Sequence, residues 1–366
     1  MPDAGSPTVT GQRDTSGRVG SPLRLAAHTD TPLWPVLVRR RGGEHPLWLK
    51  LELFNPTGSI KYRTAVGLVA ALDAERPLAP GTQVVESTSG NLGLALARVL
   101  SLLHCHLTVV VDPKVPATVR DRLRAEGAVV APVDERDTHG GYLLTRLARV
   151  RELCAEDPAL RWPDQYSNPA NPGVHRDITA RELLRQTGGD LDAVLVAVST
   201  GGTLVGISEG VRQARPGVRI YAVDVQGSLV TRDVGRSHLL TGIGSSRKSS
   251  FLRPGHYDEA LRVRDVEAFA YCRMFLDDTG LAIGGSGGAV LAAYVGGLPA
   301  ATGGPRRPVA VIPDGGDNYG VTVYDDGWLA RHGVLDETRA VQEAARADGV
   351  GFDGSALAAP LGGWRR

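Results

Sequence analysis

The chain has 366 residues, 42% of them hydrophobic, which allows two domains of ordinary size with a large core. Its formal net charge of +1 argues against a nucleic-acid or membrane-surface partner, and no apolar run is long enough to span a bilayer. We expect no signal peptide at the start. The three cysteines are widely spaced and predict neither a disulfide framework nor a metal site, which suits a cytoplasmic protein.

The first part of the chain leads to a strand. Residues 1–22 are rich in Gly, Ser, Thr, Asp and Arg and predict a disordered tail. Residues 39–45 predict a hairpin turn, and residues 47–53 follow as a strand in which leucines alternate with Lys50 and Glu52. Because this period of two is typical of a strand with one apolar and one polar face, we expect a half-buried strand.

Lys61 stands at the start of the next helix. Residues 55–58 form a turn, Ser59 is placed to cap a helix, and residues 64–72 carry the apolar pattern of that helix. A cation in a first helical turn is mildly unfavourable because it opposes the helix dipole. A lysine kept neutral by desolvation can form a Schiff base with an aldehyde cofactor. For a lysine taken alone, a solvated surface residue is the more common case.

The rest of the chain alternates between strands and helices. Strands are predicted over residues 84–86, 107–111, 128–132, 191–198, 218–225 and 309–312. Helices are predicted over residues 94–103, 119–125, 142–156, 178–187, 266–278 and 289–294, with another from about Leu204. Helical connections between successive strands indicate an α/β fold with parallel-rich sheets flanked by helices. Residues 227–258 predict a long loop, and residues 341–366 predict a loose tail.

Three turns rich in glycine and hydroxyl side chains lead into helices, at residues 87–93, 199–203 and 284–288. Such a turn presents free backbone N–H groups and a positive dipole end to an anion. The turn best suited to a phosphate consists of Ser199, Thr200, Gly201, Gly202 and Thr203. It lacks the lysine of a Walker-type loop, so a nucleoside triphosphate is not expected. Ordinary helix-capping turns use the same residues and remain the alternative.

The other two turns suggest different ligands. The carboxylate of an amino-acid substrate would suit the donors of Ser87, Thr88, Ser89, Gly90 and Asn91. Ser286 could hydrogen-bond a pyridine nitrogen without keeping it protonated, which would make the cofactor a weaker electron sink suited to β-elimination and β-replacement. A locally satisfied cap and a solvated serine are the alternatives for these two turns.

Taken together, these motifs resemble the cysteine synthase / cystathionine β-synthase family of fold type II pyridoxal-phosphate enzymes. The matching stretches are Asn55–Lys61, Thr88–Asn91, Thr200–Thr203 and Gly285–Gly287, within about residues 25–320. The resemblance implies that Lys61 is the Schiff-base lysine, that Asn91 contacts the ring hydroxyl and that Ser286 meets the pyridine nitrogen. It also implies that residues 199–203 hold the phosphate. Residues 87–91 would bind the substrate, as would Tyr142, Gln165 and Gly242 from further family-like loops.

The segment His139-Gly140-Gly141-Tyr142 is not usual in cysteine synthases and is similar to the branch of N-(2-amino-2-carboxyethyl)-L-glutamate synthases of siderophore and antibiotic biosynthesis. That branch implies β-replacement on O-phosphoserine, or an O-acylated serine, through an aminoacrylate with L-glutamate as the amine nucleophile. Cysteine synthesis with sulfide and serine/threonine dehydration are the enzymatic alternatives, and a cofactor-free binding protein is the non-enzymatic one. The basic residues of the long loop could hold a phosphate or a dicarboxylate, or could be solvated: Arg232, Arg236, Arg247, Lys248 and Arg253.

The resemblance also implies a division of the chain. Residues 23–65 and 190–335 would form a large cofactor-binding domain, and residues 66–189 a small, mobile substrate domain. We expect small amino-acid substrates and a homodimer.

Overall fold

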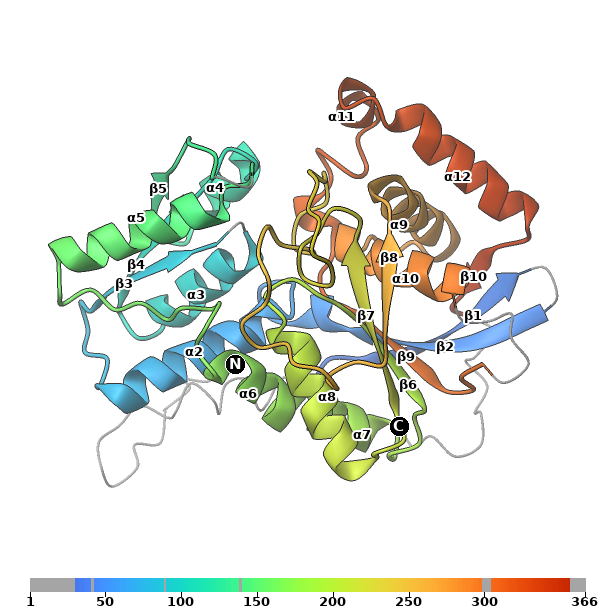
Figure 1. Ribbon diagram of the computed structural model, residues 1–366, viewed down its shortest axis with the longest axis horizontal. Helices are drawn as coiled ribbons and strands as arrows, with labels where there is room; N and C mark the ends of the chain where they lie inside the picture. The colour runs from blue at the N-terminus through green and yellow to red at the C-terminus, as the bar shows by residue number, and fades with distance from the viewer. Residues whose placement is uncertain (1–29, 41–42, 89, 138–139, 298–303, 356–366) are drawn as a thin grey trace, which may run out of the picture.

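The computed structural model describes residues 30–40, 43–88, 90–137, 140–297 and 304–355. A seven-stranded sheet and a three-stranded sheet organise these residues, and Figure 1 shows the small sheet with its helices to the left of the large one. The predicted disordered tail lies outside the described residues. The predicted α/β fold with parallel-rich sheets is confirmed. No helix in the described ranges is long and apolar enough to cross a bilayer.

The large sheet has the strand order β10-β1-β2-β9-β6-β7-β8. Its strands are β1 (Leu33–Arg40), β2 (Gly43–Leu51), β6 (Ala193–Ala197), β7 (Arg219–Val225), β8 (Glu259–Val263), β9 (Pro308–Ile312) and β10 (Gly351–Asp353). The hairpin β1–β2 and the edge strand β10 pair antiparallel. The pairs from β2 through β9, β6 and β7 to β8 are parallel. The carboxyl ends of these parallel strands therefore meet along one edge of the sheet.

Helices cover both faces of the large sheet (Figure 1). They are α6 (Ala170–Val174), α7 (Ala180–Gln186), α8 (Gly202–Ala214), α9 (Asp265–Thr279), α10 (Gly285–Gly297), α11 (Asp326–Arg331) and α12 (Leu335–Ala347). Leu195 of β6 packs in the core with α9 and α10, whereas its neighbours Val194 and Val196 pack in the core with α7 and α8. Alternate side chains thus fill two cores, as expected of strands that are buried on both sides.

The small sheet is parallel and has the order β3 (Gln83–Ser87), β4 (His106–Val111) and β5 (Val129–Pro132). Its helices are α2 (Lys61–Glu75), α3 (Asn91–Ser101), α4 (Ala117–Ala125) and α5 (Leu143–Glu156). The α2, α3 and α4 helices share a core with β3 and β4. The proposed division at residues 66 and 189 stays a prediction, and Ala180 and Leu183 of α7 pack in a core of the large sheet.

The strand predicted at residues 47–53 is present as the end of β2, which stops at Leu51, but the expectation that it is half-buried is wrong, because Lys50 and Glu52 are fully buried. Lys50 pairs with Glu182 of α7, and Arg63 pairs with Glu52 at 2.8 Å and with Glu182 at 2.7 Å. The strand is covered by helices on both faces, so its polar positions mark a buried ion-pair network. The alternation in the sequence arises from these pairs and not from contact with solvent.

Other boundaries also differ from the predictions. The glycines at 285–288 belong to the first turn of α10 and do not precede it. The short elements β8, β10 and α11 were not predicted. The predicted loose tail from residue 341 is wrong up to residue 355, since α12 and β10 occupy much of it. The tail was mispredicted because its order depends on tertiary contacts: β10 is only three residues long and is held by its pairing with β1.

Candidate active site

A cavity of about 620 Å³ lies at the carboxyl ends of the parallel strands, between the two sheets. Its lining includes the predicted site residues Lys61, Thr88, Gly90, Asn91, Tyr142, Gln165, Ser199, Thr200, Gly242 and Ser286. A smaller cavity of about 30 Å³ adjoins Lys61, Gly201 and Thr203. Segments that are far apart in the sequence therefore converge where the sequence motifs predict a site.

Two predicted site residues within the described part of the chain line neither cavity. Gly202 begins α8, and an added Cβ there would lie only 2.1 Å from Oδ1 of Asn171. Ser87 is fully buried, and its backbone oxygen accepts a hydrogen bond from Nε2 of Gln165 at 2.7 Å. Ser87 and Gln165 thus tie two cavity loops together. Ser89 lies outside the described residues.

Lys61 is the first residue of α2 and lines both cavities. Its backbone N–H donates to Oγ of Ser59 at 3.2 Å, so Ser59 satisfies one free N–H of the helix start, although Ile60 directly precedes the helix. Desolvation lowers the pKa of Lys61 to about 8, and the negative charge of Asp314 opposes this shift. A substantial fraction of the Lys61 amine is therefore neutral near physiological pH, as a nucleophile or a base requires.

The turn between β6 and α8 is shaped for a small anion. Gly201 has φ +92°, and an added Cβ there would lie 2.4 Å from Oγ of Ser249. Backbone alone fits at Gly201 and Gly202, and the free N–H groups of the first turn of α8 face outward from the turn. The small cavity lies between this turn and Lys61. The residues present thus fit a phosphate held next to an amine-bound ligand.

His175 lies behind this turn and was not predicted. Its ring nitrogens are 3.3 Å from Oγ1 of Thr203, 3.0 Å from Oγ1 of Thr64 and 3.0 Å from Oγ1 of Thr179. Desolvation, with the positive charges of Lys61 and Arg63, holds the pKa of His175 well below its usual value. The imidazole is therefore neutral, and its contacts link the Thr203 turn to the Lys61 helix.

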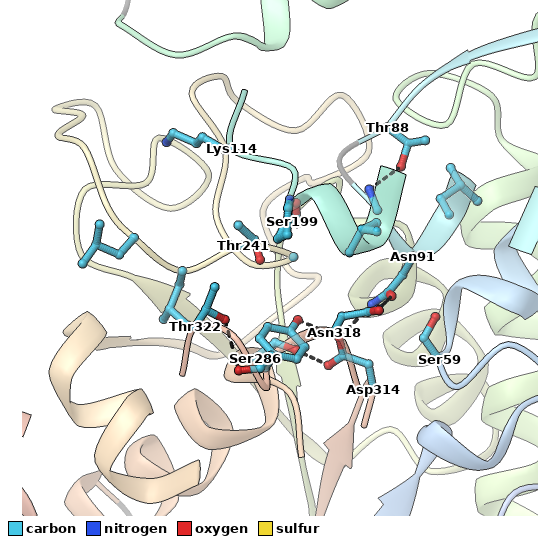
Figure 2. Close-up of a pocket in the computed structure, with 18 of the residues that line it drawn as sticks. Ser59, Thr88, Asn91, Lys114, Ser199, Thr241, Ser286, Asp314, Asn318 and Thr322 are labelled. Carbon is cyan, nitrogen blue, oxygen red and sulfur yellow. Dashed lines mark hydrogen bonds between the residues drawn. The ribbon is translucent and has the colours of Figure 1, made fainter. Parts of the chain in front are cut away.

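Asp314 is another site residue that sequence reasoning missed. It lies two residues after the end of β9, is only 3% exposed and lines the large cavity. Oδ1 of Asp314 accepts a hydrogen bond from Oγ of Ser286 at 3.2 Å, and Oδ2 accepts from Nδ2 of Asn91 and from the Tyr319 hydroxyl, both at 2.7 Å (Figure 2). Desolvation raises the pKa of Asp314, and these donors oppose the shift. Ligands bind at the carboxyl ends of parallel strands, so the position of Asp314 after a buried strand could have marked it as a site residue.

Asn318 joins the two sides of the cavity. Its Nδ2 donates to Oδ1 of Asn91 at 2.7 Å (Figure 2). Its Oδ1 accepts from the guanidinium of Arg122 in α4. Asn91 begins α3 beside the small sheet, whereas Asn318 lies in the turn after β9 of the large sheet. These amide contacts hold the small-sheet helices against the large-sheet side of the site.

Each of two cavity tyrosines has an arginine guanidinium lying over its ring. The Arg136 guanidinium carbon is 5.1 Å from the ring centre of Tyr142, and that of Arg247 is 5.4 Å from the ring centre of Tyr166. Lys114 lines the same cavity and projects from the side opposite Asp314 (Figure 2). We call Lys114, Arg136 and Arg247 the basic corner. Lys114 and Arg136 line the cavity, whereas Arg247 lies over the ring of the cavity residue Tyr166. Such a set is suited to carboxylate or phosphate groups.

The long loop at residues 227–258 partly covers the site. Oγ of Ser249 donates to the Thr200 carbonyl at 2.5 Å, and Ser250 donates to the Tyr166 carbonyl. The remaining basic residues of the loop point elsewhere: Arg232 and Arg236 are exposed, Lys248 pairs with Asp233, and Arg253 bonds to backbone carbonyls. Of the predicted loop cations, Arg247 is the one that reaches a cavity tyrosine. Within the described ranges, no group of His, Cys, Asp and Glu side chains is placed to hold a metal ion.

At the carboxyl ends of its strands, this α/β fold places a desolvated lysine beside a turn that fits a phosphate. This arrangement is typical of an enzyme whose cofactor is held by a lysine and by contacts to its phosphate. The family model described as "Pyridoxal-phosphate dependent enzyme" matches residues 25–314. The chain belongs to this family, and its cofactor is pyridoxal 5'-phosphate.

Relatives narrow the class of enzyme. The chain is 40% identical over 301 residues to the N-(2-amino-2-carboxyethyl)-L-glutamate synthase of Ralstonia nicotianae, covering 82% of this chain and 89% of the relative. It is also 40% identical over 306 residues to the synthase of that name from Cupriavidus metallidurans, with the same coverage. A crystal structure of O-ureido-L-serine synthase superposes with a TM-score of 0.71 at 28% identity, covering 85% of this chain and 99% of that one. The prediction of a pyridoxal-phosphate-dependent β-replacing synthase is confirmed.

Proposed function

We propose that the enzyme replaces the β-substituent of an activated L-serine with the amino group of L-glutamate. The first candidate for the activated serine is O-phosphoserine, and the second is an O-acylated serine. The product would be N-(2-amino-2-carboxyethyl)-L-glutamate, a precursor of 2,3-diaminopropionate. The observation that carries this proposal is the 40% identity to two synthases of that name over 82% of the chain. The basic corner supports it, because glutamate brings two carboxylates and the donor brings a phosphate.

We assign the central role to Lys61. It would hold the cofactor through its side-chain nitrogen, and its free amine would remove the α-proton of the substrate and later return it. Its pKa of about 8 suits both directions of proton transfer. The bound cofactor supplies the electron sink that stabilises negative charge at the α-carbon. Ser286 meets the ring nitrogen, Asn91 the ring hydroxyl and the turn at 199–203 the phosphate.

The substrates are assigned to opposite parts of the large cavity. The serine carboxylate lies at the start of α3, where Thr88 and Gly90 line the cavity beside the free N–H groups of that helix. Glutamate lies toward the basic corner, with Tyr142 and Tyr166 as the apolar walls that hold its methylenes. The Asn318 contacts draw the two sides together and limit the entry of water, which would hydrolyse the reactive species.

The proposed setting is a cytoplasmic homodimer with two separate active sites. The described cysteines Cys105, Cys154 and Cys272 are free thiols, as is usual in a reducing compartment. Sedimentation equilibrium measures the subunit number directly. We also propose that the small-sheet unit moves toward the large-sheet unit when substrate binds.

The assay mixes purified enzyme, O-phosphoserine and either L-glutamate or sulfide, and identifies the product by mass spectrometry. We expect the glutamate adduct, with release of inorganic phosphate. Cysteine formed with sulfide as the preferred product would support a cysteine synthase instead. A keto acid formed from the first substrate alone would identify a dehydratase. O-acetylserine in place of O-phosphoserine tests the leaving group.

A further inference from the structure

We propose that Asn318 and Arg122 are positioning residues that fix the Asn91 amide with its N–H groups, and not its oxygen, toward the cofactor. The ring hydroxyl of pyridoxal phosphate then meets a hydrogen-bond donor, which favours the ionised form of the ring oxygen. This inference rests on the proposed contact between Asn91 and the ring hydroxyl. It assigns a function to an exposed arginine of the small-sheet unit that does not itself touch the cofactor.

The Asn91 side chain can present either of two chemically opposite groups. Its oxygen only accepts and its nitrogen only donates, and the two exchange places when the amide turns over. Asn91 is the first residue of α3 and lines the large cavity, so its backbone is held by the helix while its amide can still turn. The neighbours of the amide therefore decide which group faces the cofactor.

The order of donors and acceptors is set from the surface inward. A guanidinium has N–H donors and no acceptor, so Arg122 must face the oxygen of Asn318, and it donates to that Oδ1. Nδ2 of Asn318 then points the other way and donates to Oδ1 of Asn91 at 2.7 Å (Figure 2). With its oxygen occupied, Asn91 turns Nδ2 toward the site, where one N–H reaches Oδ2 of Asp314 at 2.7 Å. The second N–H is left for the ring hydroxyl.

The backbone holds Asn318 where it can make both contacts. The N–H of Gly316 donates to the Ala282 carbonyl at 3.0 Å, and the N–H of Tyr319 donates to the Gly316 carbonyl at 2.8 Å. An added Cβ at Gly316 would lie 2.5 Å from Cβ of Ala282, so this turn sits close against its neighbour. The helices α3 and α4, which carry Asn91 and Arg122, share one core. Asn318 thus meets two packed helices from the large-sheet side.

The test reads the absorbance of the bound cofactor without substrate, because the ionised ring oxygen absorbs at longer wavelength than the neutral one. Asn318→Asp keeps the shape of the side chain but, at about pH 8, leaves it with acceptors only. Asn91 must then turn its N–H groups toward position 318 and its oxygen toward the cofactor. We expect the ratio of the long- to the short-wavelength band to fall about tenfold, as for the loss of a hydrogen bond to a charged group.

Arg122→Ala removes the donor that sets the order without adding an opposite one, so we expect a smaller fall, about threefold. Arg124→Ala is its matched control, because Arg124 lies on the same helix and pairs with Asp121. Gly320→Asp is the control for charge, since an added Cβ there meets nothing within 4 Å. Both controls should keep the wild-type ratio, and an equal fall in Gly320→Asp and Asn318→Asp would overturn the inference.

Asn91→Ala separates this inference from the contact on which it rests. An unchanged ratio in Asn91→Ala overturns the contact between Asn91 and the ring hydroxyl, and the inference with it. A lowered ratio in Asn91→Ala that stays at the wild-type value in Asn318→Asp and Arg122→Ala overturns the inference alone. If Asn318→Asp does not fold, as judged by circular dichroism, the exposed Arg122 decides the question. The product of the glutamate assay is identified independently of these spectra.

Discussion

Two lysines flank one turn, one fully buried and one partly buried at the cavity, and their surroundings differ. Lys50 is fully buried but lies against Glu182 and accompanies Glu52 and Arg63, so carboxylates offset the loss of water around its charge. Desolvation lowers the pKa of Lys50 too, while Glu52 and Glu182 oppose the shift. For Lys61, the opposing charge is that of Asp314 alone. A buried lysine surrounded by carboxylates stabilises a fold, whereas one with little compensation is available for chemistry.

The largest expected effect separates the two lysines by function. Lys61→Ala should lower kcat/KM by about 10³-fold or more, because it removes both the covalent attachment and the proton-transfer group. Steady-state kinetics measures the loss, and the visible absorbance of the bound cofactor should change as well. The melting temperature should stay within a few degrees of wild type, because the Lys61 side chain lines a cavity and is not part of the packed core. Retained turnover would refute the role assigned to Lys61.

The second effect concerns the paired cluster. Glu182→Gln should lower the free energy of unfolding by about 3–5 kcal/mol, because it leaves the charges of Lys50 and Arg63 buried with one carboxylate fewer. Urea denaturation measures this change. In the matched variant Glu209→Gln, a partly exposed ion pair at 3.7 Å with Arg176 is lost, and the expected change is below about 1 kcal/mol. Equal losses in the two variants would contradict the buried role of Glu182.

The smallest effect is a pH dependence at Lys61. Attack on the cofactor aldehyde needs the neutral amine, which dominates above the pKa of about 8. The rate at which pyridoxal phosphate binds to the cofactor-free protein should therefore rise about tenfold per pH unit below this value and level off above it. Stopped-flow absorbance follows the reaction. A rate that keeps rising to about pH 10 would indicate an ordinary lysine pKa and remove the contrast with solvated lysines.

Local patterns in the sequence predicted most of the parallel strands, the helix that begins near Lys61 and the turns around the cofactor site. They failed where a property depends on distant residues. The alternation at Lys50 and Glu52 looked like a solvent face, because Glu182 is more than a hundred positions away in the sequence. Asp314 and Asn318 contact Asn91 in α3 and Arg122 in α4, the helices that flank the other sheet. A single sequence contains no local signal for such pairs.

The C-terminal edge strand has a practical consequence for handling this protein. β10 pairs with β1, and Phe352 packs edge-on against Phe275 with ring centres 5.4 Å apart. A chain shortened after α11 would bare the outer backbone groups of β1, and an uncovered strand of that kind recruits other chains. We therefore expect purification tags to be tolerated beyond residue 355, and deletions that remove β10 to cause aggregation during expression.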